Sequence, residues 1–260
     1  MSIPLTFLHC YMCDDLGTTV EHVPPRALFP EGKDVGGENH RVELITVPSC
    51  VEHNNRKSDD DEFLMVSLAG IIGNNSIGYR HQMTKVSRAI RRSSYRLLEK
   101  AVIKNRQFIK VEVESNKFID VIWGTPDVDR LRRCFDRITR GIHFHHFSRP
   151  LKGETRVHLG YLFQSDRSAS NFSKFIKDRA ALDLAGKAQI GKNQEVFFYQ
   201  VTDPDQFGLY LFRLCFYGGL DVYVAVLPDG VARPFHLGFE LMNRGMKTFL
   251  TLGEKSYEIN

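Results

Sequence analysis

The chain contains no apolar run approaching the roughly 18 residues that a transmembrane helix needs, so the sequence predicts no membrane span. Its first eight residues are mildly apolar but lack a basic flank, which argues against a signal peptide. There is no internal repeat and no low-complexity tract. Because 42% of the 260 residues are hydrophobic and 25% are charged, the composition excludes a disordered chain and fits one large or two small globular domains.

Cysteine is scarce, and its number is odd. Of the five cysteines, three fall within the first fifty residues, whereas Cys134 and Cys215 lie in apolar stretches and are expected to be reduced core residues. This pattern argues against a disulfide framework and for a reducing compartment. We therefore expect a cytoplasmic protein in which the early cysteines bind a metal.

Two pairs of metal-ligating residues bracket the N-terminal region: Cys10, Cys13, Cys50 and His53. In each pair two residues separate the ligands, which lets both side chains face one zinc ion. All four coordination positions would come from the protein, as in structural zinc sites. The gap between the pairs exceeds that of a simple zinc ribbon, so further structure must be folded between them.

The residues between the pairs predict two strands followed by a helix. In chain order we expect a strand at 18–20 that ends in Glu21-His22, a Gly-rich loop at 31–39, a strand at 41–47, and a helix from about residue 50, with Ser49 as its N-cap, to 70–73. On that helix Asn54 is rotated by about 100° from His53. His53 can thus turn to the zinc while Asn54 faces the segment that carries His22.

This arrangement resembles the HNH (His-Asn-His) endonucleases over about residues 8–66. Their ββα-metal motif has an acid–His pair at the end of its first strand, matched by Glu21-His22-Val23-Pro24-Pro25. Its helix carries the last metal ligand, matched by the segment from Cys50 through His53-Asn54-Asn55-Arg56-Lys57-Ser58. In many members, a structural zinc ion bound by two C-x-x-C pairs stabilises the motif. The Cys3His set would reproduce that zinc, with His53 in place of a cysteine.

The resemblance implies a catalytic site for phosphodiester hydrolysis. His22 would be the general base that activates water, and Glu21 and Asn54 would hold one Mg²⁺ or Mn²⁺ ion. Asn39, beside His40, is the best match to the middle Asn that braces the loop. The departure from the family is Glu21, because Asp is commoner before the base. Asp60, Asp61 and Glu62 form either a solvated helix face or a set that orients Arg56 or a metal-bound water.

Basic residues concentrate between residues 80 and 106, where nine Lys and Arg stand against one acidic residue. The local net charge is therefore +8 although the whole chain carries only +4. We expect a helix at 82–104 that tracks nucleic-acid phosphates. The predicted contacts are Arg80, Lys85, Arg88, Arg91, Arg92 and Arg96. An arginine stripe on a second helix, at 130, 133, 137 and 140, has the same interpretation, and the alternative for both is a solubilising surface.

The remaining sequence predicts an α+β domain with an antiparallel sheet. We expect a hairpin at 108–114 and 117–123, a helix at 127–141, a strand at 156–163, a helix at 169–184, and strands at 195–201, 209–217 and 220–227. His143-Phe144-His145 alternates as a strand edge does. A further metal site at His143, His145 and His146 is the less favoured alternative.

The predicted fold class is thus α+β: an N-terminal ββα-metal (HNH) module with a structural zinc at 1–78, a basic helix at 79–106 and an α+β domain at 107–260. The predicted function is a metal-dependent endonuclease that acts on DNA, with an RNase or a non-catalytic zinc-stapled adaptor as alternatives. By analogy alone, such a nuclease with an unassigned domain fits bacterial defence or mobile elements. Expected partners are nucleic acid and a regulatory protein or a second copy of the chain, with no membrane.

Overall fold

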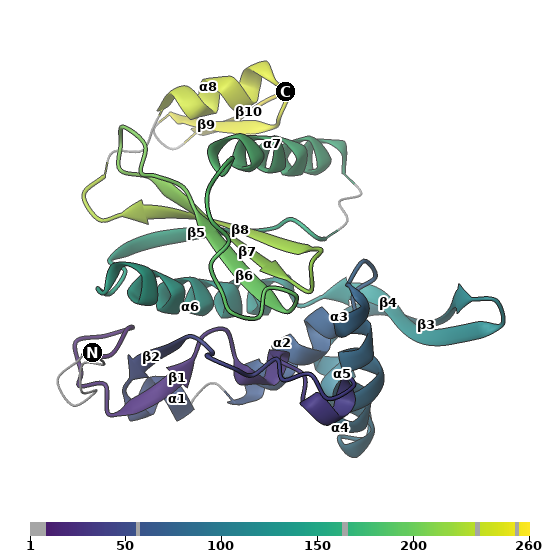
Figure 1. Ribbon diagram of the computed structural model, residues 1–260. Coiled ribbons are helices and arrows are strands. Elements are labelled where there is room, and N and C mark those ends of the chain that lie inside the picture. The colour runs from purple at the N-terminus through teal and green to yellow at the C-terminus, as the bar shows by residue number, and fades with distance from the viewer. Residues whose placement is uncertain (1–8, 56–57, 163–165, 232–234, 253–254) are drawn as a thin grey trace. The chain divides into compact units, whose positions relative to one another are not determined.

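The computed structural model describes residues 9–55, 58–162, 166–231, 235–252 and 255–260 (Figure 1). The chain is α+β, and its sheets are antiparallel, as predicted. It forms two compact units. The first contains the chain up to Leu151 together with Gln189–Phe198 and Cys215–Leu220. The second contains Lys152–Ala188, Tyr199–Leu214 and Asp221–Asn260, so the units divide the chain at residues other than 78 and 106.

The α-helices within the described ranges are α1 (Val51–Asn55), α2 (Ser58–Ala69), α3 (Ser76–His81), α4 (Ser87–Arg92), α5 (Arg96–Ala101), α6 (Val128–Phe147), α7 (Arg167–Asp183) and α8 (Phe235–Asn243). Two short 3₁₀ helices, Arg26–Leu28 and Gly32–Asp34, lie between β1 and β2. The strands are β1 (Thr19–His22), β2 (Thr46–Ser49), β3 (Val102–Glu114), β4 (Lys117–Pro126), β5 (Gly153–Leu159), β6 (Phe197–Val201), β7 (Tyr210–Phe216), β8 (Leu220–Pro228), β9 (Thr248–Leu252) and β10 (Lys255–Ile259).

Strands β1 and β2 form a small antiparallel sheet that leads directly into α1. Thr19 pairs with Ser49 and His22 with Thr46. The second strand was predicted at 41–47, but it begins five residues later and includes Pro48, which occupies a sheet with only two strands. Ser49 therefore belongs to the strand, and the residue before helix α1 is Cys50 rather than the predicted cap Ser49. The order strand, strand, helix agrees with the sequence prediction.

The prediction of one continuous helix at 82–104 is wrong. Helix α3 continues through a π-helical turn, Gln82–Val86, into α4, which ends at Arg92. Ser94 and Tyr95 then adopt φ values of 51° and 65°, in the left-handed region that a continuing helix cannot contain. Helix α5 resumes at Arg96 and ends at Ala101, and residues 102–106 belong to strand β3.

The predicted hairpin is present and longer than expected. Strands β3 and β4 pair in antiparallel register on either side of the turn. Asn116 in that turn has φ = 61°, which Asn tolerates better than most residues because its short polar side chain can bond locally. Three register shifts interrupt the ladder, two of them between Val102 and Gln107.

Helix α6 provides a long buried face to the first unit. Asp127 caps it by accepting the backbone N–H of Arg130, 3.0 Å away. Leu131, Cys134, Phe135 and Ile138 are buried, as the spacing predicted. Gly141 lies where a Cβ atom would meet the γ-methyl groups of Val23 at 2.7 and 2.8 Å. A glycine is thus required for α6 to approach the segment that follows β1.

The histidines at the end of α6 do not form the predicted strand edge, because the helix continues to Phe147. His143 is buried and its Nδ1 donates to the carbonyl of Arg149 across 3.0 Å. Burial lowers the pKa of His143 to about 4. Within the described residues, His143, His145 and His146 belong to no group of three ligands that could hold a metal.

The larger sheet has four strands in the order β5-β8-β7-β6, and most of its residues belong to the second unit. The pairing of β5 with β8 is antiparallel, and Val157 lies opposite Val224. The strand predicted at 156–163 starts three residues earlier and ends at Leu159, and residue 163 lies outside the described residues. Helix α8 and the hairpin of β9 and β10 were not predicted. In the described part of the chain, no helix is both long and apolar enough to span a membrane.

Candidate metal centre and the polar residues of β1 and α1

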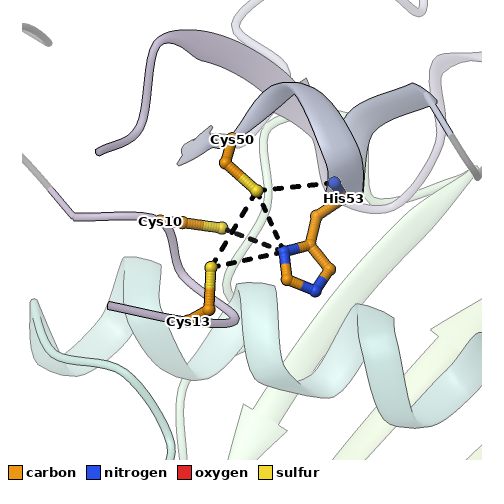
Figure 2. Close-up of side chains that lie close together, drawn as sticks. All are labelled: Cys10, Cys13, Cys50 and His53. Atoms are coloured by element: carbon orange, nitrogen blue, oxygen red, sulfur yellow. Dashed lines mark hydrogen bonds between the residues drawn. The ribbon is translucent and has the colours of Figure 1, made fainter. Parts of the chain in front are cut away.

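Four side chains converge at the start of the first unit (Figure 2). They are the predicted ligands Cys10, Cys13, Cys50 and His53. Nδ1 of His53 lies 3.6, 3.5 and 3.1 Å from the sulfur atoms of Cys10, Cys13 and Cys50, respectively. The sulfur atoms of Cys13 and Cys50 are 3.9 Å apart, and all four ligand atoms lie within 4.8 Å of one another.

Apart from the shorter 3.1 Å between His53 and Cys50, these distances match the edges of a metal-centred tetrahedron. With Zn–S near 2.3 Å and Zn–N near 2.0–2.1 Å, a tetrahedral site has S···S edges of about 3.8 Å and S···N edges of about 3.6 Å. The cysteines are not disulfide-bonded. Three thiols and one imidazole nitrogen thus form a group that could hold one metal ion, and no fifth protein ligand is required.

Backbone hydrogen bonds contribute to the placement of the ligands. The N–H of Cys10 donates to the carbonyl of Asp15, and the N–H of Tyr11 donates to the carbonyl of Pro48 in β2. Backbone N–H groups also donate to sulfur, from Met12 to Cys10 and from His53 to Cys50. Burial disfavours the thiolate of Cys10, but the backbone donors around it, first that of Cys50, prevail and lower its pKa.

Glu21 lies inside the first unit. Only 3% of its surface is exposed, and its Oε1 accepts a hydrogen bond of 2.8 Å from the hydroxyl of Tyr11. With Asp60, Asp61 and Arg137, it lines a small cavity between β1, α2 and α6. That cavity has room for roughly one water molecule. The acid that was expected to hold a catalytic cation is therefore enclosed.

His22 follows Glu21 on β1 and is more exposed. Successive side chains of a strand point to opposite faces, so His22 and Glu21 leave β1 in opposite directions. The strand itself therefore does not bring Glu21 and His22 together in the single catalytic site that the resemblance implies.

Asn54 is turned towards β1, the strand that carries His22, as expected. Its Nδ2 donates to the hydroxyl of Thr19 across 3.1 Å, and that hydroxyl donates to the carbonyl of Ser49. Thr19 shares a face of β1 with Glu21. With the amide nitrogen engaged by Thr19, the carboxamide oxygen of Asn54 is the atom that could serve as a metal ligand. Residues 56 and 57, which complete the motif, lie outside the described residues.

Asn39 lies in the loop between β1 and β2. Its side-chain oxygen accepts the backbone N–H of Arg41, 3.0 Å away, which closes a local turn. No hydrogen bond in the described part of the chain links Asn39 to Asn54.

Asp60 on α2 binds two arginines of α6. Its Oδ1 accepts a hydrogen bond from Nε of Arg130, and its Oδ2 accepts one from Nη1 of Arg137, both at 2.8 Å. The guanidinium of Arg130 also stacks over the ring of Phe63, 4.2 Å from its centroid. Arg140 pairs with Asp136 on its own helix. Asp60 thus joins two helices rather than belonging to a solvated face, and its predicted alternative partner, Arg56, lies outside the described residues. Most of the arginine stripe faces these carboxylates rather than solvent.

The predicted nucleic-acid contacts differ in their surroundings. Arg80, Arg91, Arg92 and Arg96 are exposed. Arg88 is exposed but bonds Asp34 at 2.8 Å, and that carboxylate raises its pKa. Lys85 lies 3.8 Å from Glu31, and burial, followed by the charge of Arg41, lowers its pKa. Arg88, Arg91 and Arg92 share one face of α4, because positions three and four apart are neighbours on a helix.

A second group of possible metal ligands was missed: Glu38, His40 and Glu195. His40 stood beside the predicted Asn39, but no spacing in the sequence connects residue 40 with residue 195. The sequence shows only a histidine within a polar loop. Its burial and its approach to Glu195, more than 150 residues away, appear only in the structure.

Comparisons with protein-family models, curated proteins and solved structures found no match for this chain.

Proposed function

We propose that this protein is a metal-dependent nucleic-acid endonuclease whose N-terminal β1-β2-α1 segment is a ββα-metal module stapled by a structural Zn²⁺ ion. One observation carries the proposal: the Cys3His cluster joins the loop before β1 to the start of α1. The residue after ligand His53 is Asn54, and it contacts the strand that ends in Glu21-His22. Three elements of the HNH resemblance are thereby gathered within one small segment.

The zinc assignment is supported by the chemistry of the four donors. Thiolates and imidazole select zinc among common cellular cations, and a closed four-ligand set is typical of structural sites. Between its ligands the segment has only two short strands, two 3₁₀ helices of three residues each and the start of α1, so its regular structure is short. Metal binding would therefore supply much of its folding free energy.

In the proposed reaction, the imidazole of His22 takes a proton from the water that attacks phosphorus. Glu21 and Asn54 would supply the carboxylate and carboxamide oxygens that suit Mg²⁺ or Mn²⁺, and such an ion stabilises charge on the phosphate and the leaving oxygen. The exposed arginines of α3 and α4 would hold the phosphates outside the site. DNA is the proposed substrate.

The test is cleavage of supercoiled plasmid in the presence of Mg²⁺ or Mn²⁺. Wild type should nick or cut the plasmid. His22→Ala should lose cleavage by a factor of about 10² or more while keeping its zinc and its melting temperature. The matched control is His145→Ala, a histidine of α6 that should leave cleavage unchanged. Cleavage by zinc-loaded His22→Ala at the wild-type rate would refute the role of His22.

A second function has a specific observation in its favour. Glu21 is buried and bonded to Tyr11, and it leaves β1 on the face opposite to His22. That geometry favours a non-catalytic adaptor that keeps the zinc-stapled fold and binds nucleic acid through its basic surface. Binding of DNA or RNA without metal-dependent cleavage of either would support the adaptor, and competition between the two nucleic acids identifies the preferred one.

A further inference from the structure

A second group of metal-ligating side chains lies in the first unit, apart from the cysteines. Glu38 and His40 come from the loop between β1 and β2, and Glu195 comes from the segment before β6. One ligand atom from each residue lies within 4.8 Å of the other two. Segments more than 150 residues apart thus bring two carboxylates and an imidazole together.

His40 is the most informative of the three. Only 3% of it is exposed, and its Nε2 is buried without a hydrogen-bond partner. This nitrogen lies 3.5 Å from Oε2 of Glu38, but no hydrogen bond joins them. A buried polar group without a hydrogen bond destabilises the folded state. A ligand that accepts the lone pair of Nε2 while binding the neighbouring carboxylates would remove this cost.

The surrounding hydrogen bonds hold the two segments side by side. Nδ2 of Asn193 donates to the carbonyl of Val42 across 2.8 Å, which ties the segment before β6 to the loop. Nδ2 of Asn75 donates to the carbonyl of Glu195 across 2.7 Å. Within the loop, Asn39 closes the turn between Glu38 and Arg41. The three ligating side chains are therefore presented by a framework that does not depend on a bound ion.

We propose that Glu38, His40 and Glu195 bind one divalent cation, Zn²⁺ or Mn²⁺. An imidazole nitrogen with two carboxylate oxygens suits these borderline ions better than Ca²⁺ or Mg²⁺, which take oxygen ligands. For metal–ligand distances of 2.0–2.2 Å, a tetrahedral site has edges of about 3.4 Å, close to the 3.5 Å between His40 and Glu38. Three protein ligands leave a further position for water.

This site is independent of the proposed nuclease function and of the Cys3His cluster. A bound cation would link the β1-β2 loop to the segment before β6. The alternative interpretation of the short distance between His40 and Glu38 is an ion pair with a protonated His40, which would bind no metal. A metal site would bind added Mn²⁺, whereas the ion pair would not.

The test is titration with Mn²⁺ of the full-length protein that carries a single equivalent of Zn²⁺ for the Cys3His cluster, with free Mn²⁺ followed by its electron paramagnetic resonance signal. Glu38→Gln and Glu195→Gln are suitable variants, because both carboxylates are exposed and their loss should not unfold the loop. Each should weaken the binding of one equivalent by tenfold or more. The matched control is Glu43→Gln, an exposed glutamate of the same loop outside the cluster, and it should bind as wild type does.

Asn54→Ala separates this site from the proposed catalytic cation site. Binding of one equivalent that survives Asn54→Ala but weakens in both glutamine variants supports the assignment. If wild type shows no such equivalent, or if Glu38→Gln and Glu195→Gln bind as tightly as Glu43→Gln, the site does not exist as proposed. Neither result depends on nuclease activity, so the two proposals can fail separately.

Discussion

Tyr11 donates its phenolic hydrogen to Oε1 of Glu21 across 2.8 Å, and both side chains are buried. Burial and then the negative charge of Glu21 raise the pKa of Tyr11 far above its ordinary value, so the phenol remains a donor. Tyr11 lies between the two cysteines of the first metal-ligating pair. The bond therefore connects the metal cluster to the acid on β1.

Replacing Tyr11 by Phe should lower the free energy of unfolding by about 1–3 kcal/mol, because a buried carboxylate oxygen loses its donor. Urea denaturation measured at neutral pH checks this value. Tyr257→Phe is the matched control, since Tyr257 is 49% exposed, and it should change the stability by less than about 0.5 kcal/mol. Equal stabilities for the two variants would mean that the bond between Tyr11 and Glu21 contributes nothing.

Removal of one cluster thiol should abolish zinc binding at the Cys3His cluster. Cys13→Ala is expected to lower the zinc content of the purified protein by one equivalent relative to wild type and to melt the β1-β2-α1 segment, because the remaining three ligands leave the site open. Metal analysis and the melting temperature measure both effects. Cys134→Ala, which removes a buried thiol of α6 outside the cluster, should keep its zinc. Full zinc content in Cys13→Ala would contradict the assignment.

Asp60 is predicted to stabilise the packing of α2 on α6. Asp60→Ala leaves Arg130 and Arg137 without their half-buried partner and should cost roughly 2–3 kcal/mol, the range for hydrogen bonds to charged groups. The control is Asp129→Ala, which breaks an exposed pair with Arg132 and should cost less than about 1 kcal/mol. Denaturant unfolding compares the two. Similar losses of unfolding free energy in both variants would show that Asp60 stabilises the fold no more than an exposed ion pair does.

The exposed arginines of α4 should govern the salt dependence of nucleic-acid binding. If Arg91 and Arg92 each contact a phosphate, the double variant Arg91→Ala, Arg92→Ala should reduce the slope of log K against log salt by about 2 for duplex DNA. Fluorescence anisotropy over a salt series measures the slope. Arg156→Ala, an exposed arginine of the second unit, should not change it. An unaltered slope in the double variant would mean that Arg91 and Arg92 do not contact phosphates, and it would favour the alternative of a solubilising surface.

The sequence contained enough information for the fold class and for the convergence of four possible metal ligands. Two-residue spacing within each ligand pair is a local property, and the Cys3His geometry followed from it. Helices α6 and α7 were placed because apolar residues recur at helical spacing over many turns. Period-two alternation located the strands of the larger sheet in the same way.

What could not be predicted depends on distant contacts or on single residues. The break between α4 and α5 follows from left-handed backbone at Ser94 and Tyr95, neither of which is a glycine that would signal it. The burial of Glu21 depends on the hydroxyl of Tyr11 and on residues of α2 and α6 around the cavity. Likewise, nothing near His40 in the sequence points to Glu195.

His81 gives the protein an acid-sensitive element in its first unit. It is fully buried, and its Nε2 donates to the carbonyl of Ala27 across 3.1 Å. Burial, followed by the charge of Lys85, lowers the pKa of His81 to about 4. Below its ordinary value of about 6.5, the unfolded chain binds a proton that the folded protein does not, so stability must fall as the pH is lowered from 6.5 towards 4.

The expected loss from His81 alone is about 2 kcal/mol between pH 7 and pH 5. Urea denaturation of wild type and His81→Gln at both pH values isolates this contribution, because glutamine can donate to Ala27 but does not titrate. The variant should lose about 2 kcal/mol less than wild type over this interval. His143, whose pKa burial also lowers to about 4, is present in both proteins, so its contribution cancels in the difference. If wild type and His81→Gln lose the same stability on acidification, His81 is accessible to protons in the folded state and its burial is not the cause of acid sensitivity.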